Sequence, residues 1–425
     1  MHARPENLDV IGMGDDGLDG LPIPKARMLF AADVIFASRR LAALLPDNLA
    51  EKTRCWPSPF SLMEDEIARL REQGAKVAIL TSGDPLWHGA GAALLKTFGR
   101  AALRFHPAPS SFSLAAARLG WALQDTETLS LHGVSSARIE PFVQPGARIL
   151  ALTSNGLTPL EVARRLVARG FGPSRMQILA HLGGKAEQCF NFSAQEIVDK
   201  EETGFPDLHV LAIEAIAGED ARILPRAPGL SDDAFVHDGQ ITKQAVRAIT
   251  AAALCPAPGA LLWDVGAGCG SISAEWLRLA GPRAKALAIE RDEARRAMIS
   301  QNAENLGTLD IEVVPGEAPE ALKNLPPPDA VFIGGAVRDG AVFSACMAAL
   351  KPGGVLIANA VTTQGAAALA QRHDSHGGEL LHIAISRAAP LGPASTLRPA
   401  LPVTQLRLRK PLQSANMHPA RKEAS

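Results

Sequence analysis

The sequence lacks tyrosine altogether, and aromatic residues make up only 4% of its 425 residues. A GC-rich genome can produce such a composition, so we attach no function to it. Cysteine is also scarce, and the five cysteines are dispersed without a C-x-x-C pair: Cys55, Cys189, Cys255, Cys269 and Cys346. An odd, scattered set argues against a disulfide framework and against a structural zinc site.

Neither sign of charge is in excess, since 43 basic residues face 44 acidic ones and the formal net charge is −1. This balance gives no electrostatic reason to expect nucleic acid or an anionic membrane as a partner. No apolar run approaches the roughly 20 residues that cross a bilayer. Residues 1–7 also lack the apolar core of a signal peptide. We therefore expect a soluble, cytoplasmic protein that binds no nucleic acid, no membrane and no metal.

The length of the chain exceeds what one hydrophobic core usually organises, so two domains are expected. Residues 218–229 combine charges with prolines and glycines, as linkers between domains do. We predict one domain over residues 1–217 and a second over residues 230–410. The tail over residues 411–425 is polar and basic without periodicity, which predicts disorder.

Short apolar runs followed by amphipathic stretches recur along the whole chain. Such alternation predicts α/β architecture with mainly parallel sheets. The predicted strands are residues 8–13, 76–80, 148–152, 176–179, 261–265, 284–289, 311–314, 330–333 and 355–358, and the predicted helices include residues 159–169 and 292–305.

The second half contains a glycine-rich turn between a predicted strand and a predicted helix. Its residues are Gly266, Ala267, Gly268, Cys269 and Gly270. Glycines let the backbone approach a nucleotide closely, and the N-terminus of a helix offers unpaired N–H groups. The next strand ends at Glu290, whose carboxylate can accept hydrogen bonds from both hydroxyls of an adenosine ribose.

Dehydrogenases share this arrangement, and three details favour S-adenosylmethionine (SAM) over a dinucleotide. Asp264 precedes the turn, where it could face the ammonium group of the cofactor. Ser271 stands where a dinucleotide fingerprint expects glycine or alanine. The third strand ends in Gly316, Glu317 and Ala318, which could border an adenine ring. A glycine turn that binds no ligand is the remaining alternative.

Residues 328–335 and 350–359 extend this pattern, which resembles the Rossmann-like fold of class I SAM methyltransferases. That fold typically finishes with an antiparallel strand, for which residues 402–409 are the candidate. Together with residues 238–243, the motifs resemble the decarboxylating precorrin methyltransferases of cobalamin biosynthesis. This resemblance implies that Thr242 lies beside the cofactor, and a role as a helix N-cap is compatible with that.

The first half carries a different set of glycine motifs. The order Gly12-x-Gly14, then Gly83-Asp84-Pro85, then Ser110-Ser111 before a helix of small residues resembles the tetrapyrrole methylases, which are class III SAM enzymes. Members of that family hold SAM in a cleft between two α/β lobes. The resemblance implies a cofactor site formed by Gly12, Gly14, Ser82, Gly83, Asp84, Leu86, Ser110, Ser111 and Gly183. Many members carry Gly-Pro-Gly-Asp where this chain has residues 14–17, Gly-Asp-Asp-Gly.

The two halves together resemble fused precorrin methyltransferases with two SAM sites. The resemblance implies that the second domain methylates C15 and removes the C12 acetate carboxyl as CO2. The first domain then methylates C5, which gives precorrin-8. Both related families form oligomers, so a homo-oligomer is expected. A SAM methyltransferase with another substrate, or a dinucleotide-dependent oxidoreductase, are the alternatives.

Such a reaction needs no strong base, because electron-rich meso carbons can attack the sulfonium methyl group in line. Alignment supplies much of the acceleration, with effective molarities of roughly 10⁵–10⁸ M. We expect cationic side chains to hold the acetate and propionate groups, and the candidates are Lys243, Arg338 and Arg387. His132 is a further candidate in the first half. Surface solvation for the cations, and a structural role for His132, remain open.

Overall fold

The computed structural model describes residues 8–57 and 61–412. These residues form two compact units, with the boundary between Arg222 and Ile223, and the short segment Ala137–Pro141 groups with the second unit. The boundary falls inside residues 218–229, the predicted linker. Residues 413–425 of the predicted tail lie outside the described residues. No helix in the described part of the chain is both long and apolar enough to cross a membrane.

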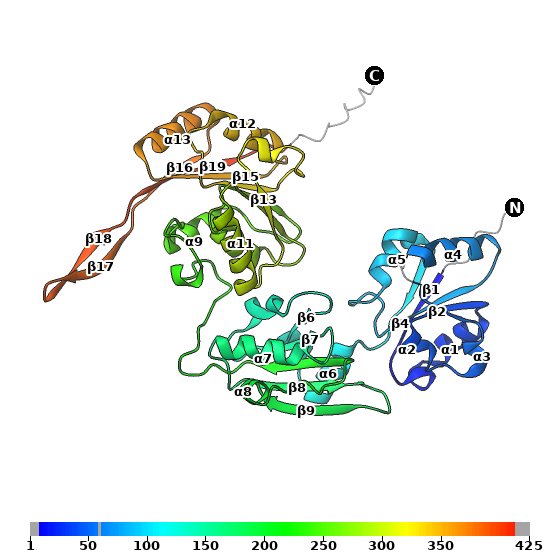
Figure 1. The fold of residues 1–425 in the computed structure, drawn as a ribbon. Coiled ribbons are helices and arrows are strands. Elements are labelled where there is room, and N and C mark those ends of the chain that lie inside the picture. The colour runs from blue at the N-terminus through cyan, green and yellow to red at the C-terminus, as the bar shows by residue number, and fades with distance from the viewer. Residues whose placement is uncertain (1–7, 58–60, 413–425) are drawn as a thin grey trace, which may run out of the picture. The chain divides into compact units, whose positions relative to one another are not determined.

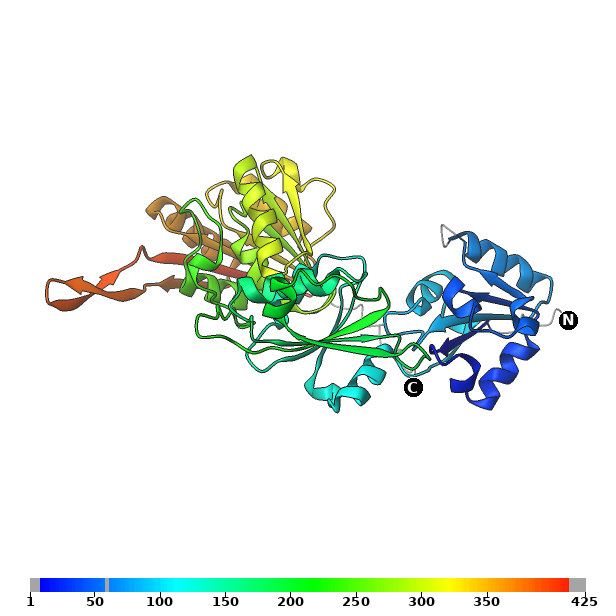
Figure 2. The same cartoon turned by 60° about the horizontal axis from the view of Figure 1, so that its bottom comes forward.

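The first unit opens with a parallel sheet in the strand order β3-β2-β4-β1-β5. Its strands are β1 (Leu8–Met13), β2 (Val34–Ala37), β3 (Thr53–Cys55), β4 (Val77–Ser82) and β5 (Leu103–His106). The intervening helices are η1 (Gly17–Gly20), α1 (Ile23–Ala31), α2 (Arg39–Ala42), α3 (Asp47–Ala50), α4 (Ser61–Glu72), α5 (Gly91–Phe98) and η2 (Arg100–Ala102). Figure 2 shows helices on both faces of this sheet, which is why most residues of its central strands are buried and apolar.

A second, mixed sheet completes the first unit, in the order β6-β7-β10-β8-β9. Its strands are β6 (Glu127–Ser130), β7 (Arg148–Leu152), β8 (Arg175–Ala180), β9 (Gln188–Ser193) and β10 (His209–Glu214). The accompanying helices are α6 (Ser111–Leu119), η3 (Leu123–Asp125), η4 (Ser136–Phe142), α7 (Thr158–Ala168) and α8 (Ala194–Asp199). Ser110 caps α6 by accepting a hydrogen bond from the Ser113 amide, and Gly120 ends the helix in a left-handed conformation.

The second unit contains a seven-stranded sheet in the order β13-β12-β11-β14-β15-β19-β16, in which β19 pairs antiparallel with both of its neighbours. Its strands are β11 (Leu261–Val265), β12 (Lys285–Glu290), β13 (Ile311–Pro315), β14 (Ala330–Ile333), β15 (Val355–Ala360), β16 (Glu379–Ile383) and β19 (Val403–Arg409). The helices are η5 (Asp232–Ala234), α9 (Gln244–Ala253), α10 (Ser271–Ala280), α11 (Glu293–Leu306), η6 (Glu320–Leu322), α12 (Gly340–Ala349) and α13 (Thr363–His376). Figure 1 shows α12 and α13 on one face of the sheet and α9 and α11 on the other.

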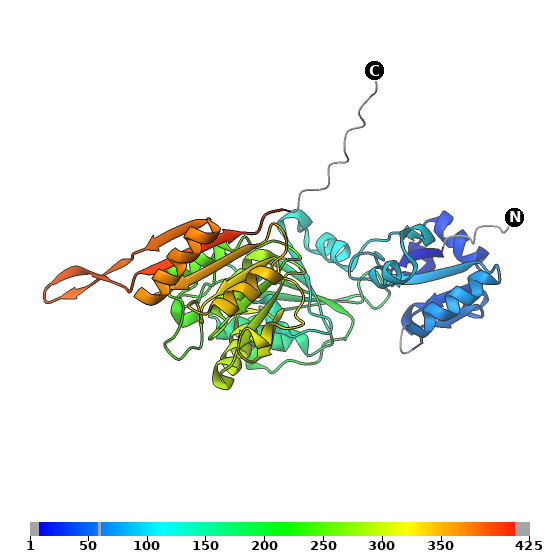
Figure 3. The same cartoon turned by 90° about the horizontal axis from the view of Figure 1, so that it is seen from above.

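A two-stranded hairpin, β17 (Ser386–Leu391) with β18 (Ala394–Pro399), extends away from the seven-stranded sheet, as Figure 3 shows clearly. Most of its side chains are exposed, including Leu391 and Leu397. The residues at its base turn back toward the carboxyl ends of the parallel strands, where they line the cavity described below.

The structure confirms the α/β architecture, and each predicted strand and helix matches an observed element within about two residues. The predicted final antiparallel strand is β19. The interpretation of Thr242 as a helix N-cap is wrong, because α9 begins at Gln244 and its N-cap position is Lys243, without a side-chain cap bond.

A buried ion network holds the start of the second unit against the helices α9 and α10. The Arg247 guanidinium is fully buried and donates to Glu275 at 2.7 Å, to Asp232 at 3.0 Å and to the Thr242 carbonyl at 2.6 Å. Glu275 also accepts hydrogen bonds from the backbone amides of Gly229 and Leu230. The network therefore holds the segment that leads to Thr242, one wall of the cavity, against α9 and α10.

We predict that Glu275→Ala lowers the free energy of unfolding of the second unit by about 3–5 kcal/mol, because it leaves a buried guanidinium without a main partner. Urea unfolding of the full chain measures this change. The matched control is Glu379→Ala, since Glu379 pairs with Arg407 at 3.7 Å and both side chains are more than a third exposed. We expect Glu379→Ala to lower the free energy of unfolding by less than about 1 kcal/mol. Equal losses in both variants would contradict the role given to the network.

Candidate active site

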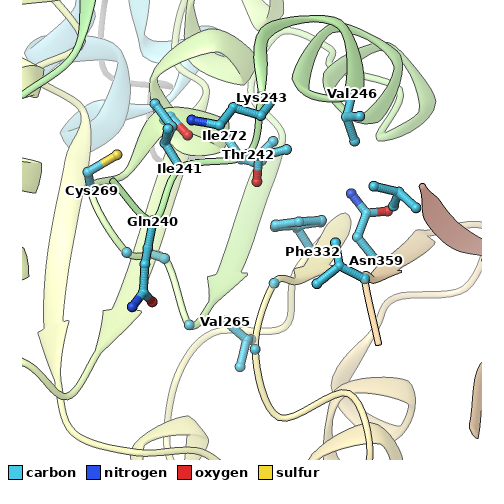
Figure 4. A pocket seen from close by; sticks show the side chains of 18 of the residues that line it. Gln240, Ile241, Thr242, Lys243, Val246, Val265, Cys269, Ile272, Phe332 and Asn359 are labelled. Atoms are coloured by element: carbon cyan, nitrogen blue, oxygen red, sulfur yellow. The ribbon is translucent and has the colours of Figure 1, made fainter. Parts of the chain in front are cut away.

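The second unit contains a cavity of about 930 Å³ at the carboxyl ends of the parallel strands. It lies where the strand order reverses between β11 and β14, which is the usual place for a ligand in an open α/β sheet. The volume is near the upper end of the range for small-molecule sites. Figure 4 shows side chains that line it, with Cys269 and Gln240 on one side and Asn359 on the other.

The glycine-rich turn after β11 forms one wall of this cavity. Gly266, Gly268 and Gly270 all have positive φ angles, of 73°, 59° and 76°, which side chains rarely tolerate. A Cβ atom at Gly266 would lie 3.1 Å from the Gly335 amide nitrogen, and one at Gly270 would lie 3.0 Å from the Ile299 side chain. The turn therefore keeps bare backbone toward the cavity, as the approach of a nucleotide requires.

Glu290 closes the turn from the end of β12. One of its carboxylate oxygens accepts a hydrogen bond from the Gly268 amide at 2.9 Å, and the other accepts from the Asp292 amide at 3.0 Å. Its side chain lines the cavity although the residue is only 5% exposed. Each carboxylate oxygen can accept a further hydrogen bond. Glu290 is therefore placed to receive two neighbouring hydroxyl groups.

Asp264 lies beneath the turn and is not among the residues that line the cavity. One oxygen accepts hydrogen bonds from the Ser273 amide at 3.1 Å and the Ser273 hydroxyl at 2.6 Å, so the carboxylate fastens α10 to the end of β11. Its other oxygen has no partner within the described residues. Burial raises the pKa of Asp264 to about 6, and the Ser273 hydrogen bonds oppose that shift.

Most of the predicted site residues of this unit come together around the cavity. The lining contains Thr242, Lys243, Gly266, Ala267, Gly268, Cys269, Glu290, Gly316, Glu317, Ala318 and Arg387. Gly270, Asp264 and Arg338 are not in the lining, and Arg338 is exposed. Burial raises the pKa of the Cys269 thiol, which opposes a role as a nucleophile.

The half of the cavity away from the turn is mainly apolar. Val361, Ile383, Ile385 and Leu401 line it, the last three from the base of the hairpin and its flanking segments. Arg387 stands at this side, and its guanidinium donates a hydrogen bond to the Gln244 side chain at 3.5 Å. This half can therefore take a large apolar body that carries negatively charged groups.

The first unit has its own cavity, of about 470 Å³, lined by residues from both of its sheets. Of the predicted residues, Gly14, Ser82, Gly83, Asp84, Ser110, Ser111 and His132 line it, whereas Gly12, Leu86 and Gly183 do not. Gly12 instead allows a close backbone contact, since a Cβ atom there would lie 2.1 Å from the Gly83 carbonyl oxygen. His132 contacts the Thr153 carbonyl oxygen through Nδ1 at 3.2 Å.

A charged cluster in the first cavity was not foreseen from the sequence. Arg40 donates hydrogen bonds to the Asp15 carboxylate and, at 2.8 Å, to the Ser82 hydroxyl. His181 lies 4.0 Å from the other Asp15 oxygen. Burial lowers the pKa of Arg40. Asp15 belongs to the loop of residues 14–17, Gly-Asp-Asp-Gly, which differs from the Gly-Pro-Gly-Asp pattern given above. This loop therefore carries the ion-pair partner of Arg40.

Within the second cavity, sequence reasoning missed Asn359 and the apolar residues of the hairpin base. Asn359 does follow a predicted strand, at the edge where ligands bind, and that position was the available signal. The described residues contain no cluster of side chains that could hold a metal ion.

The Rossmann-like sheet with its glycine turn and Glu290 defines the second unit as a class I-like methyltransferase domain, and the two-sheet first unit has the tetrapyrrole methylase fold. The family of precorrin methyltransferase domains matches residues 233–410, and that of the tetrapyrrole (corrin/porphyrin) methylases matches residues 7–198. The chain belongs to the precorrin-6Y C(5,15)-methyltransferases (decarboxylating).

Relatives of that name cover nearly the whole chain. One from a Sinorhizobium species is 45% identical over 399 residues, which are 94% of this chain and 95% of that protein. One from Mycobacterium tuberculosis is 38% identical over 397 residues, or 93% and 98% of the two chains. Among solved structures, the C-terminal domain of the precorrin-6Y C5,15-methyltransferase from Rhodobacter capsulatus is 42% identical and covers 44% of this chain and all of its own, with a TM-score of 0.42.

The raised pKa of Asp264 predicts how stability depends on pH. A carboxyl group with a folded-state pKa of about 6, against an ordinary value of 3.8, binds more protons in the folded than in the unfolded chain between those values. The stability it contributes is present below about pH 4 and is lost as the pH rises through about 6. The free energy of unfolding of Asp264→Asn should therefore rise by about 3 kcal/mol relative to that of the parent protein between pH 4 and pH 7.

Urea unfolding of both proteins across this pH range tests the prediction. Ser273→Ala provides a second test, because it removes a hydrogen bond that favours the charged carboxylate. In Ser273→Ala the pKa of Asp264 should be higher, so the loss of stability should extend to a higher pH than in the parent protein. A difference between Asp264→Asn and the parent that does not vary with pH would contradict the assignment.

Proposed function

We propose that the protein transfers methyl groups from SAM to C5 and C15 of a precorrin and removes the C12 acetate carboxyl as CO2, which gives precorrin-8 in cobalamin biosynthesis. In this proposal each unit binds its own SAM. The first unit methylates C5, and the second unit methylates C15 and decarboxylates. Near full-length similarity to precorrin-6Y C(5,15)-methyltransferases supports the reaction.

The observation that supports a SAM site most strongly is the pairing of Glu290 with the glycine turn. The bare backbone of Gly266 and Gly268 leaves room for the nucleoside, and Glu290 offers free lone pairs to ribose hydroxyls. Gly316, Glu317 and Ala318 border the same part of the cavity, where an adenine ring would lie. When bound, SAM supplies an electrophilic methyl group.

The protein contributes orientation, charge and exclusion of water. The apolar half of the second cavity suits the face of a tetrapyrrole, and Lys243 and Arg387 can hold its acidic side chains. Lys243 also lies 3.6 Å from Asp232, so it is held in place by the Arg247 network. In the first cavity, Arg40 and His132 are the corresponding candidates.

The cellular setting is also part of the proposal. The described cysteines form no disulfide, and three of them are exposed. Free exposed thiols suit the reducing cytoplasm. We further propose a homo-oligomer, as expected from the related families.

Calorimetric titration of SAM into the full chain tests the two-site proposal, with about two SAM expected per chain. Glu290→Ala should weaken one site at least about tenfold, because hydrogen bonds to a charged acceptor contribute about 1.5–3 kcal/mol each. Glu320→Ala is the matched control, since Glu320 is exposed and outside the cavity lining. It should leave both sites unchanged.

A variant of the first unit completes this experiment. Gly83 has a φ angle of 59°, and a Cβ atom there would lie 3.3 Å from the Pro109 carbonyl oxygen. Gly83→Val should therefore remove the other site only. A stoichiometry of one in the parent protein, or the loss of both sites in either variant, would contradict two independent cofactor sites.

A further inference from the structure

Three polar side chains from α9, β15 and β19 meet beside the apolar half of the second cavity. The Asn359 amide nitrogen lies 2.9 Å from the Thr250 hydroxyl oxygen. The Gln405 amide nitrogen lies 3.1 Å from the same hydroxyl and 2.9 Å from the Asn359 amide oxygen. Thr250 and Gln405 are fully buried, whereas Asn359 lines the cavity. Such a polar cluster is costly to bury and needs an explanation.

The network determines which way the Asn359 amide points. The Thr250 hydroxyl donates its only proton to the Val246 carbonyl oxygen at 2.8 Å, so it can only accept from its other two neighbours. Asn359 accordingly donates from its NH2 group to Thr250 and accepts from Gln405 through its oxygen. One N–H of Asn359 remains without a partner among the described residues, and the amide side chain reaches into the cavity from the side opposite Cys269 (Figure 4).

The surroundings of this N–H differ from those of the cationic groups in the same cavity. Phe332 and Val246 lie around Asn359 in Figure 4, and Val361, Ile383 and Val403 complete an apolar lining. Lys243 and Arg387, in contrast, are more exposed. The cavity thus offers two kinds of place for a carboxylate: cations that favour its charge, and one neutral donor in an apolar wall.

We propose that the Asn359 N–H holds the acetate carboxyl that is lost as CO2, while Lys243 and Arg387 hold carboxylates that stay. This role of Asn359 rests on the proposed function. In it, the Asn359 amide selects the acetate carboxyl that leaves. Thr250 and Gln405 are positioning residues, since they act only by fixing the Asn359 amide.

The chemistry of decarboxylation explains why a neutral donor suits this position. The bond between the carboxyl carbon and the side-chain methylene breaks, and its electron pair moves onto the methylene and into the conjugated macrocycle. CO2 leaves, and a proton from water completes the methyl group. Because negative charge leaves the carboxylate during the step, a cation there would stabilise the starting state more than the transition state. A neutral N–H orients the group without that penalty.

The test compares CO2 release with C15 methylation in the full chain. With precorrin-6Y and carbon-13-methyl SAM, methyl transfer to each carbon is followed by NMR and CO2 by gas analysis. In Asn359→Leu, which is similar in size, we expect CO2 release to fall at least tenfold more than C15 methylation. SAM affinity should stay within threefold. Arg387→Ala is the matched comparison. There we expect the KM for precorrin to rise, whereas the ratio of CO2 release to C15 methylation should not change.

Variants of Thr250 keep the test decisive if Asn359→Leu does not fold. Thr250→Ser retains the hydroxyl, so its ratio of CO2 release to C15 methylation should stay within twofold of that of the parent protein. Thr250→Val removes the hydroxyl and should lower this ratio as Asn359→Leu does. Equal losses of CO2 release and methylation in Asn359→Leu, or an unchanged ratio in Thr250→Val, would overturn the role of Asn359. If the parent protein neither methylates nor decarboxylates precorrin-6Y, the proposed function itself fails, which is a distinct result.

Discussion

The left-handed backbone of the turn between β11 and α10 is the constraint on which the second site depends. Gly266, Gly268 and Gly270 all adopt it, and the close approach of Gly266 to Gly335 leaves no room for a side chain. Asp264 fastens the helix side of this turn and Glu290 fastens its cavity side. The backbone groups that face the cavity are therefore set before any ligand arrives, so binding requires little reorganisation.

The two cavities differ in the charged and apolar groups that line them. The cavity of the second unit has a polar half beside the glycine turn and an apolar half bordered by cations and Asn359. The first unit places a charged cluster, Asp15 with Arg40 and His181, inside its own cavity. Two different folds in one chain thus form two differently charged cavities.

The sequence predicted the local elements well because each has a periodic apolar pattern and a clear end. The predicted helix over residues 292–305 is α11, which Asp292 caps and Gly307 ends. The hairpin β17–β18 was missed, because both of its faces are exposed and no alternation marks it. Asn359 and Arg40 were missed for another reason. Their roles depend on partners from distant segments, Thr250 and Gln405 in one case and Asp15 in the other, and no local pattern reports such pairs.

We propose that each unit carries a complete and independent methyl-transfer site. Mass spectrometry of the tetrapyrrole product made by Gly83→Val, which alters only the first cavity, tests this claim most directly. We expect a product that has gained one methyl group and lost one carboxyl group. A product with both methyl groups, or one that retains the carboxyl, would contradict it.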